Sequence, residues 1–298
     1  MVSAAVVAGS LPTGIVAPPG AAAAAARVCS SAADAATAQR LGTGIRTALR
    51  GRWSTTSVTV YDRRRRIRCR VSPGRHYDSA SIVKVTILGA LLRHAIEQDR
   101  LLTASEISLA GKMITRSDND AASTLWKRLG RARLKRFLRL AGMTHTALGP
   151  GGHWGLTQIT AADQLTLLTR FTETNAVLTD RSRRYALTLM NAVVASQRWG
   201  VPAGAPHGVT AHVKNGWLPR STHGWRVHSI GGFDGDEHDY LIVVLSHDNP
   251  SMAYGVKTIE LVAQAVHRAL NPGRPAAVPQ STPDPAWEIP GEQVPGLP

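Results

Sequence analysis

Residues 212–246, HVKNGWLPRSTHGWRVHSIGGFDGDEHDYLIVVLS, contain three runs that are rich in strand-forming residues. Only a few residues, Pro, Gly and Asp among them, separate one run from the next. Such short connections join antiparallel neighbours, because parallel strands need a crossover of about a dozen residues or more. The stretch therefore predicts three antiparallel strands, at 212–218, 225–233 and 239–246.

The rest of the chain extends this sheet in both directions. Residues 57–61 and 67–71 alternate in polarity and predict a hairpin, and helical spacing predicts helices at 32–49 and 252–270. A long helical block separates the two groups of strands. We therefore predict an α/β fold with two lobes: one antiparallel sheet with flanking terminal helices, and an inserted all-α lobe at about 76–205. Clefts between lobes are favoured places for ligands.

Composition limits the class of protein. The chain has 298 residues, and 43% of them are hydrophobic, which excludes a wholly disordered or collagen-like chain. The formal net charge is +15, and Lys supplies only six of the 35 basic residues. This charge favours an anionic partner such as a cell-wall polymer, or it reflects arginines on solvated faces. We expect the protein to be a monomer, and we expect it to have no nucleic-acid partner.

The two ends differ in composition from the body at 28–270. Residues 1–27 predict a signal peptide or an Ala/Pro-rich disordered tail, and 271–298, with eight prolines, predict a disordered tail. No apolar run predicts a membrane span. We therefore expect a secreted or cell-envelope protein. In such a compartment Cys29 and Cys69 form either one disulfide or two unpaired thiols.

Three short motifs carry the candidate chemistry. Ser81-Ile-Val-Lys84 opens the most apolar predicted helix, and Ser117-Asp118-Asn119 lies in a polar break of the helical block. Lys214-Asn215-Gly216 lies on the first strand after that block. S-x-x-K alone is common by chance, so the prediction rests on the three motifs in this order and on these elements.

The residue types suit acyl transfer. Ser81 is a weak nucleophile that needs a base, and Lys84 lies one helical turn away on the same face. Burial in an apolar helix would lower the pKa of Lys84 and let the neutral amine act as that base. The backbone N–H groups of Ser81 and Trp217 are candidates for an oxyanion hole.

The other motif residues suit substrate binding and proton relay. Ser117 is placed to pass a proton to the leaving group, and Asn119 offers an amide to a substrate amide. Lys214 offers a cation either to a substrate carboxylate or for tuning Ser117. Structural alternatives exist for each motif. They are an extended surface lysine at 84, a plain helix cap at 117–119 and an exposed strand lysine at 214.

The set SIVK, SDN and KNG resembles the penicillin-recognising serine hydrolases, and most of all the class A β-lactamase-like group. The resemblance covers about residues 32–270. It implies the two-lobed β-lactamase/transpeptidase-like fold, an acyl-enzyme on Ser81 and substrate contacts from Asn119, Lys214, Asn215, Gly216 and Trp217. It implies a β-lactam or a cell-wall peptide amide or ester as substrate.

Two departures from the family pattern affect the expected chemistry. Asn215 stands where the family usually has Thr or Ser, and no Asp or Glu occurs between Asp120 and Asp163. The expected deacylating Glu is therefore missing, and His153 is the titratable side chain in its loop, ALGPGGHWGLT. We predict slow β-lactam turnover. The alternatives are a catalytically idle module that binds peptidoglycan or penicillin, and a nucleic-acid binder suggested by charge alone. The His and Cys spacing predicts no metal site and no cofactor.

Overall fold

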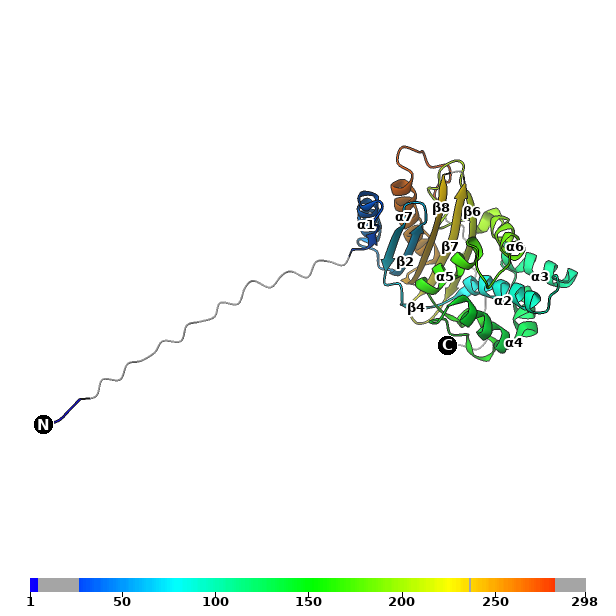
Figure 1. The fold of residues 1–298 in the computed structure, drawn as a ribbon, viewed down its shortest axis with the longest axis horizontal. Helices are drawn as coiled ribbons and strands as arrows, with labels where there is room; N and C mark the ends of the chain where they lie inside the picture. Colours follow the sequence, from blue (N-terminus) through cyan, green and yellow to red (C-terminus); the bar gives the residue numbers. More distant parts are fainter. Residues whose placement is uncertain (5–26, 236, 282–298) are drawn as a thin grey trace.

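The computed structural model describes residues 1–4, 27–235 and 237–281. Its elements follow the predicted order of helix, strands, helical block, strands and helix (Figure 1). The strands are β1 (Cys29–Ser30), β2 (Thr55–Asp62), β3 (Ile67–Val71), β4 (His76–Asp78), β5 (Gln158–Thr160), β6 (Thr210–Pro219), β7 (Trp225–Gly235) and β8 (His238–Asn249). The α-helices are α1 (Ala35–Leu49), α2 (Val83–Glu97), α3 (Ala104–Thr115), α4 (Asn119–Ala141), α5 (Ala161–Thr172), α6 (Asp180–Asn191) and α7 (Met252–Leu270). Short 3-10 turns are η1 (Ala80–Ile82), η2 (Pro150–Gly152), η3 (Trp154–Leu156) and η4 (Ala195–Gln197).

One six-stranded sheet organises the molecule. Its strand order is β1-β3-β2-β8-β7-β6, and every neighbouring pair is antiparallel. An early and a late strand thus meet in the middle of the sheet, where β2 pairs with β8 from Thr55↔His247 to Asp62↔Tyr240. Strand β6 is an edge strand. The predicted α/β architecture is confirmed.

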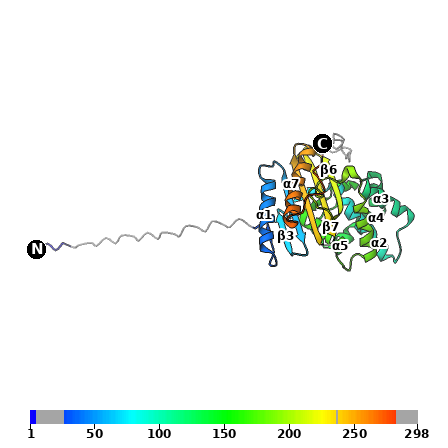
Figure 2. The ribbon, with the colours of Figure 1, turned by 90° about the horizontal axis from the view of Figure 1, so that it is seen from above.

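The two faces of the sheet pack against different helices (Figure 2). Strand β8 shows why, because its side chains alternate between two hydrophobic cores. Ile242 and Val244 belong to the core shared with α1 and α7, whereas Leu241, Val243 and Leu245 belong to the core of the helical lobe. The lobe is therefore anchored on one face of the sheet and the terminal helices on the other.

Helix α2 lies at the centre of the helical lobe. Eleven of its 15 residues are buried, as the apolar run in its sequence predicts. Gly89 lets it approach α4 closely, because a Cβ at that position would lie 2.3 Å from the Phe137 ring. Helix α3 begins with a capping box of Thr103 and Glu106, which satisfies two backbone N–H groups of its first turn.

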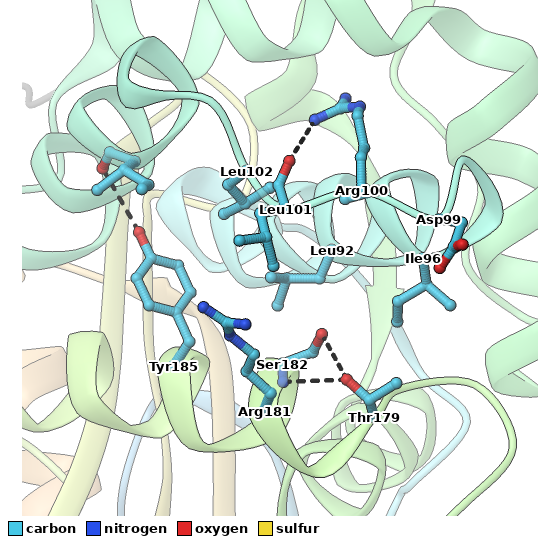
Figure 3. Close-up of a pocket in the computed structure, with 12 residues that line it drawn as sticks. Leu92, Ile96, Asp99, Arg100, Leu101, Leu102, Thr179, Arg181, Ser182 and Tyr185 are labelled. Carbon is cyan, nitrogen blue, oxygen red and sulfur yellow. Dashed lines mark hydrogen bonds between the residues drawn. The ribbon is translucent and has the colours of Figure 1, made fainter.

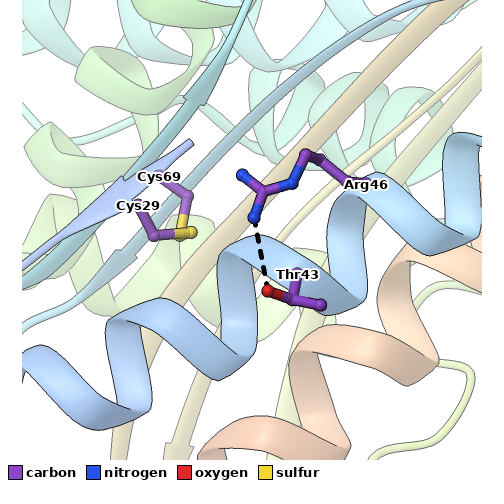
Figure 4. Close-up of a disulfide and its surroundings, with 4 residues drawn as sticks. All are labelled: Cys29, Thr43, Arg46 and Cys69. Atoms are coloured by element: carbon purple, nitrogen blue, oxygen red, sulfur yellow. Dashed lines mark hydrogen bonds between the residues drawn. A yellow bond between two sulfur atoms is a disulfide. The ribbon is translucent and has the colours of Figure 1, made fainter. Parts of the chain in front are cut away.

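A disulfide joins Cys29 of β1 to Cys69 of β3 (Figure 4). Both cysteines are buried against α1, and the two residues are also register partners in the sheet. The bridge closes a loop of 40 residues. On the chain-entropy model such a crosslink stabilises the folded state by about 4 kcal/mol.

Two features differ from the sequence prediction. The helical lobe region also holds a two-stranded sheet of β4 and β5, which was not predicted. Residues 271–281, predicted as part of a solvated tail, lie along the body instead. The N–H of Gly204 donates to the carbonyl of Val278 at 2.8 Å, and the Ser281 hydroxyl donates to Glu260 at 2.7 Å. Composition alone did not reveal these backbone partners.

The remaining predictions about the ends concern residues 5–26 and 282–298, which lie outside the described residues. None of the helices in the described part of the chain combines the length and the apolar character that crossing a membrane requires.

Candidate active site

Ser81 lies in η1, the turn that leads into α2, and 8% of its surface is exposed. The preceding residue, Ala80, has a positive φ of 45°, which is uncommon for a residue with a Cβ. Hydrogen bonds hold this turn from outside: the N–H of Ser79 donates to the Thr157 carbonyl at 2.9 Å. The chain therefore bends sharply and presents Ser81 at the start of the helix.

Lys84 lies one turn further along, and its side chain is fully buried. Its Nζ is within hydrogen-bond distance of four oxygens: Ser81 Oγ at 2.9 Å, Ser117 O at 2.6 Å, Ser117 Oγ at 3.2 Å and Asn119 Oδ1 at 2.6 Å. An ammonium group has only three N–H bonds to donate. A hydroxyl of Ser81 or Ser117 can in turn donate to the amine when it is neutral, so the geometry suits either protonation state.

Ser117 and Asn119 reach Lys84 from the junction of α3 and α4. Ser117 has a positive φ of 57°, and Asp118 caps α4 by accepting the N–H of Ala121 at 2.7 Å. The helix-cap alternative for this motif is thus correct for Asp118. Its two neighbours nevertheless face Lys84, so the same tripeptide both starts a helix and lines the site.

Lys214 approaches from β6 and is fully buried. Its Nζ donates to Ser117 Oγ at 3.0 Å and to the carbonyl of Asn215 at 2.8 Å. Desolvation, followed by repulsion from Lys84, holds the pKa of Lys214 well below its usual value of 10.5. Within the described residues no carboxylate lies within 4 Å of this amine, so its charge is available to an anionic ligand.

Gly216 brings the edge strand against Ser81. A Cβ at residue 216 would lie 2.9 Å from the backbone nitrogens of Ser81 and Ile82, so a side chain at 216 is sterically excluded. Trp217 follows on the same edge strand. This close approach is what a shared oxyanion hole requires, and the pairing of the Ser81 and Trp217 N–H groups stays a prediction.

The side chain of Asn215 does not join this network, although its backbone carbonyl accepts from Lys214. Its Nδ2 donates to the carbonyls of Gln197 and Trp199, both at 2.9 Å. Alternate residues of a strand point to opposite sides, so the side chain beside Lys214 is directed to the η4 turn. The prediction that Asn215 binds substrate is not supported, because this amide holds the neighbouring backbone instead.

The loop expected to carry a deacylating acid contains Trp154. Lys84 Nζ lies 4.7 Å from the centre of the Trp154 ring, and the indole Nε1 donates to Ser123 Oγ at 3.1 Å. His153 points elsewhere: its ring lies near Gly151. Sequence reasoning missed Trp154, because one aromatic residue in a Gly-rich loop carries no periodic or motif signal.

Residues behind η1 fix the segment that leads to Ser81. Asp78 pairs with Arg226 of β7 at 3.0 Å and accepts a hydrogen bond from Gln158 Nε2 at 2.6 Å. The carbonyl of Asp78 accepts from His228 Nε2 at 2.8 Å, and burial lowers the pKa of His228 to about 4. Sequence reasoning named none of these, because their roles come from strand pairing across the sheet.

A second hollow lies in the helical lobe and shares no residue with this site (Figure 3). It has a volume of about 400 Å³ and lies between α6 and the segment that joins α2 to α3. Its lining is mostly apolar, and Tyr185 of α6 donates to the Ile107 carbonyl at its edge. Its serine, Ser182, is hydrogen-bonded to Thr179 at 3.0 Å rather than to a base, so the hollow does not reproduce the pairing of Ser81 with Lys84.

A sequence model of the beta-lactamase enzyme family matches residues 98–270. This range includes the second and third motifs and begins after Ser81 and Lys84. No curated protein matches the sequence.

Solved structures match over most of the chain. The TLA-1 extended-spectrum beta-lactamase superposes with a TM-score of 0.69 and 17% identity, covering 77% of this chain and 98% of that one. The putative class A beta-lactamase PenP from Rhodopseudomonas palustris gives 0.66 and 20%, covering 76% and 98%. PBP-A gives 0.65 and 21%, covering 77% and 95%. At these identities the likeness establishes the fold.

Proposed function

This chain belongs to the beta-lactamase enzyme family, and on that premise we propose that it is a serine hydrolase that forms an acyl-enzyme on Ser81. The observation that carries the proposal is the buried contact of 2.9 Å between Lys84 Nζ and Ser81 Oγ. The proposed substrates are β-lactams and cell-wall peptide amides or esters.

Acylation begins when Ser81 Oγ attacks the substrate carbonyl carbon and its proton passes to neutral Lys84 Nζ. The N–H groups of Ser81 and Trp217 stabilise the oxyanion of the tetrahedral intermediate. The bond from carbon to the leaving group then breaks, and the leaving atom takes the proton of Ser117 Oγ. Lys84, 3.2 Å from that oxygen, replaces the proton and returns to the neutral amine.

The substrate's other groups meet Asn119 and Lys214. The Asn119 carbonyl oxygen accepts from Lys84 at 2.6 Å, and the amide Nδ2 is the group of this side chain that can donate to a substrate carbonyl. Protonated Lys214 binds a substrate carboxylate, because charge-assisted hydrogen bonds are the stronger ones. Asn215 is left out of this scheme, since both of its amide hydrogens are engaged elsewhere.

Deacylation is the slow step in this proposal. Hydrolysis needs a base that holds and deprotonates a water, and the family's class A members use a loop glutamate. Here Trp154 lies over Lys84 in that loop, and residues 121–162 contain no Asp or Glu. Losing a dedicated base costs about 10²- to 10⁴-fold in rate, or roughly 3–5 kcal/mol in barrier.

Intact-mass measurement with benzylpenicillin over time tests this function. We expect one penicilloyl adduct per chain that persists well beyond its time of formation. The Ser182→Ala variant is a matched control, because Ser182 lies on α6 away from the site. Absence of any adduct across a panel of β-lactams and active esters would instead indicate an idle binding module. Fast hydrolysis with no detectable adduct would contradict slow deacylation.

We also propose that the protein acts outside the cytoplasm, near anionic cell-wall polymer. The Cys29–Cys69 disulfide supports export, because disulfides persist in oxidising compartments. A basic surface on α4 supports the polymer as neighbour. It consists of exposed cations at Lys127, Arg128, Arg131, Arg133, Lys135, Arg136 and Arg139.

Retention on an immobilised phosphodiester wall polymer tests the polymer contact. Lys127→Glu/Lys135→Glu should weaken salt-sensitive retention, whereas Lys257→Glu on α7 should change it little. Equal retention of all three proteins would contradict the basic surface on α4 as the contact.

A further inference from the structure

Two histidines and an aspartate converge at one end of the sheet, among residues that take no part in the proposed chemistry. His223 lies in the turn between β6 and β7, and His247 and Asp248 lie at the end of β8. One ligand atom from each of the three lies within 4.8 Å of the others. We call these three residues the His–Asp–His cluster.

Both imidazole rings of the cluster face the Asp248 carboxylate. His223 Nδ1 lies 2.8 Å from Asp248 Oδ1, and His247 Nδ1 lies 2.7 Å from Asp248 Oδ2. The two imidazole rings are 4.7 Å apart between their centres. The same nitrogen of each ring thus faces a different oxygen of one carboxylate.

The backbone enforces this convergence. His223 and Asp248 both have a φ of 59°, in the left-handed region that residues with a Cβ rarely adopt. The N–H of Asp248 donates to the carbonyl of His223 at 2.6 Å, which fastens the turn to the strand end. Thr55 of β2 donates its hydroxyl to Asp248 Oδ2 at 2.5 Å and orients the carboxylate.

We propose that the His–Asp–His cluster is a binding site for a divalent transition-metal ion of the zinc type. Two imidazole nitrogens and one carboxylate oxygen are a donor set that zinc prefers. On binding, each imidazole gives up its Nδ1 proton contact with Asp248 and offers the Nδ1 lone pair to the metal. Its proton then resides on Nε2.

Burial and charge fit an open, peripheral site. The His223 side chain is 61% exposed, so solvent can supply the remaining ligands, whereas His247 is 12% exposed and held in the fold. The cluster carries one negative charge when both imidazoles are neutral. The nearby guanidinium of Arg226 is paired with Asp78 at 3.0 Å, which reduces its repulsion of a cation.

A metal at this point would tie three segments together. It would join the turn between β6 and β7 to the end of β8, and through Thr55 to the start of β2. The site is separate from Ser81, so the proposal stands or falls independently of the proposed hydrolase function. We expect bound metal to stabilise the fold, since a ligand that binds only the native state raises the unfolding temperature.

Titration of the tag-free full chain with ZnCl₂ in a calorimeter tests the site. We expect saturable binding of one ion per chain, with a higher unfolding temperature in its presence. Co²⁺ should give the visible absorption of a low-symmetry site with nitrogen ligands. His223→Ala should lower zinc affinity at least ~10-fold, because loss of even an outer-shell partner typically costs about 10- to 100-fold.

His145→Ala is the matched control. His145 is 63% exposed and lies 3.7 Å from Asp163, so it resembles His223 in exposure and in its acidic neighbour. Among the described residues its ring does not belong to a group of three potential ligands, as the His223 ring does. This variant should bind zinc like the unmodified protein. Asp248→Asn should also weaken binding by removing the charge while keeping the shape. The proposal is overturned if the unmodified protein does not bind one zinc ion per chain. It is also overturned if His145→Ala loses as much zinc affinity as His223→Ala.

Discussion

The two faces of the six-stranded sheet each bury a polar network, and the two networks are built differently. On the α7 face, His267 Nε2 donates to the Val201 carbonyl at 2.8 Å, and Tyr240 lies 2.8 Å from His267 Nδ1. A carbonyl can only accept, so Nε2 carries the proton and Nδ1 accepts from the Tyr240 hydroxyl. This network is neutral, and both ring nitrogens have partners.

On the opposite face, the buried groups are two amines, Lys84 and Lys214, that meet at the hydroxyl of Ser117. Two like charges in a buried site repel each other, and removal from water penalises each of them. Such an arrangement is poor for stability and good for attracting an anion or moving a proton. The comparison teaches how a structural polar network differs from a candidate reactive site. Buried polar groups that satisfy one another stabilise the fold, whereas buried amines that repel each other favour an anionic ligand.

The largest expected effect follows from removing the proposed nucleophile. Ser81→Ala should abolish covalent labelling by every reactive probe, because the variant lacks the Oγ atom that the proposed mechanism acylates. The unfolding temperature should stay close to that of the unmodified protein, since the side chain is small. Intact mass and thermal unfolding measure both. A labelled Ser81→Ala protein would assign the nucleophile to another residue.

Removing the base should be the next largest effect. Lys84→Met keeps the length of the side chain but not the amine, and acylation should slow at least ~100-fold. The free energy of unfolding should fall by about 1–3 kcal/mol, because Ser117 O and Asn119 Oδ1 lose Lys84 as a donor. Stopped-flow acylation and urea unfolding separate the two readouts. A large loss of stability with normal acylation would show that Lys84, like His267, supports the fold and does not act as the base.

The neutral network should respond to acid. Burial lowers the pKa of His267 to about 4, against about 6.5 in the unfolded chain. As pH falls through 6.5 the unfolded state takes up the proton first, so stability is lost between pH 6.5 and 4. At pH 5 the loss from this residue is about 2 kcal/mol.

Unfolding by urea at pH 7.5 and pH 5 measures this loss, and His267→Gln should lose less stability between the two values. His145→Gln, at an exposed position, should behave like the unmodified protein. Equal pH dependence in the unmodified protein and His267→Gln would contradict the neutral assignment of this imidazole.

Lys214 should give the smallest and most selective effect. Lys214→Met should weaken acylation by carboxylate-bearing substrates about 10-fold, as expected for one charge-assisted hydrogen bond, and affect neutral esters less. Because the pKa of Lys214 is depressed, the preference for carboxylates should decline as pH rises, well below pH 10.5. Competition kinetics with matched acid and ester substrates measure the preference. Equal losses on both substrates would point to proton transfer through Ser117 instead.

Much of this molecule follows from local sequence patterns. The five main strands and both terminal helices lie where alternation and helical spacing place them, because each pattern reflects burial of one face. Ser81, Lys84, Ser117, Asn119 and Lys214 meet as the motifs predict. These motifs are informative because their chemistry needs particular residue types near particular helix and strand ends.

Other parts were decided by contacts between distant segments. Asn215 was assigned to the substrate side from its neighbours in sequence, but strand alternation and the η4 turn direct its amide elsewhere. Residues 271–281 look like a solvated tail by composition, yet the loop at 204–206 supplies their backbone partners. The carbonyls that Asn215 binds and the backbone groups that bind residues 271–281 cannot be inferred from these residues themselves.

The sequence by itself therefore determined the order of elements, the proposed nucleophile Ser81 and the two amines of the site. Only the tertiary structure placed Trp154 over Lys84 and brought His223 to His247 and Asp248. The physical reason is the range of the interactions. Helical and strand periodicity act over a few residues and are written in the chain, whereas a loop aromatic or a turn histidine acquires its role from whichever distant segment the fold sets beside it.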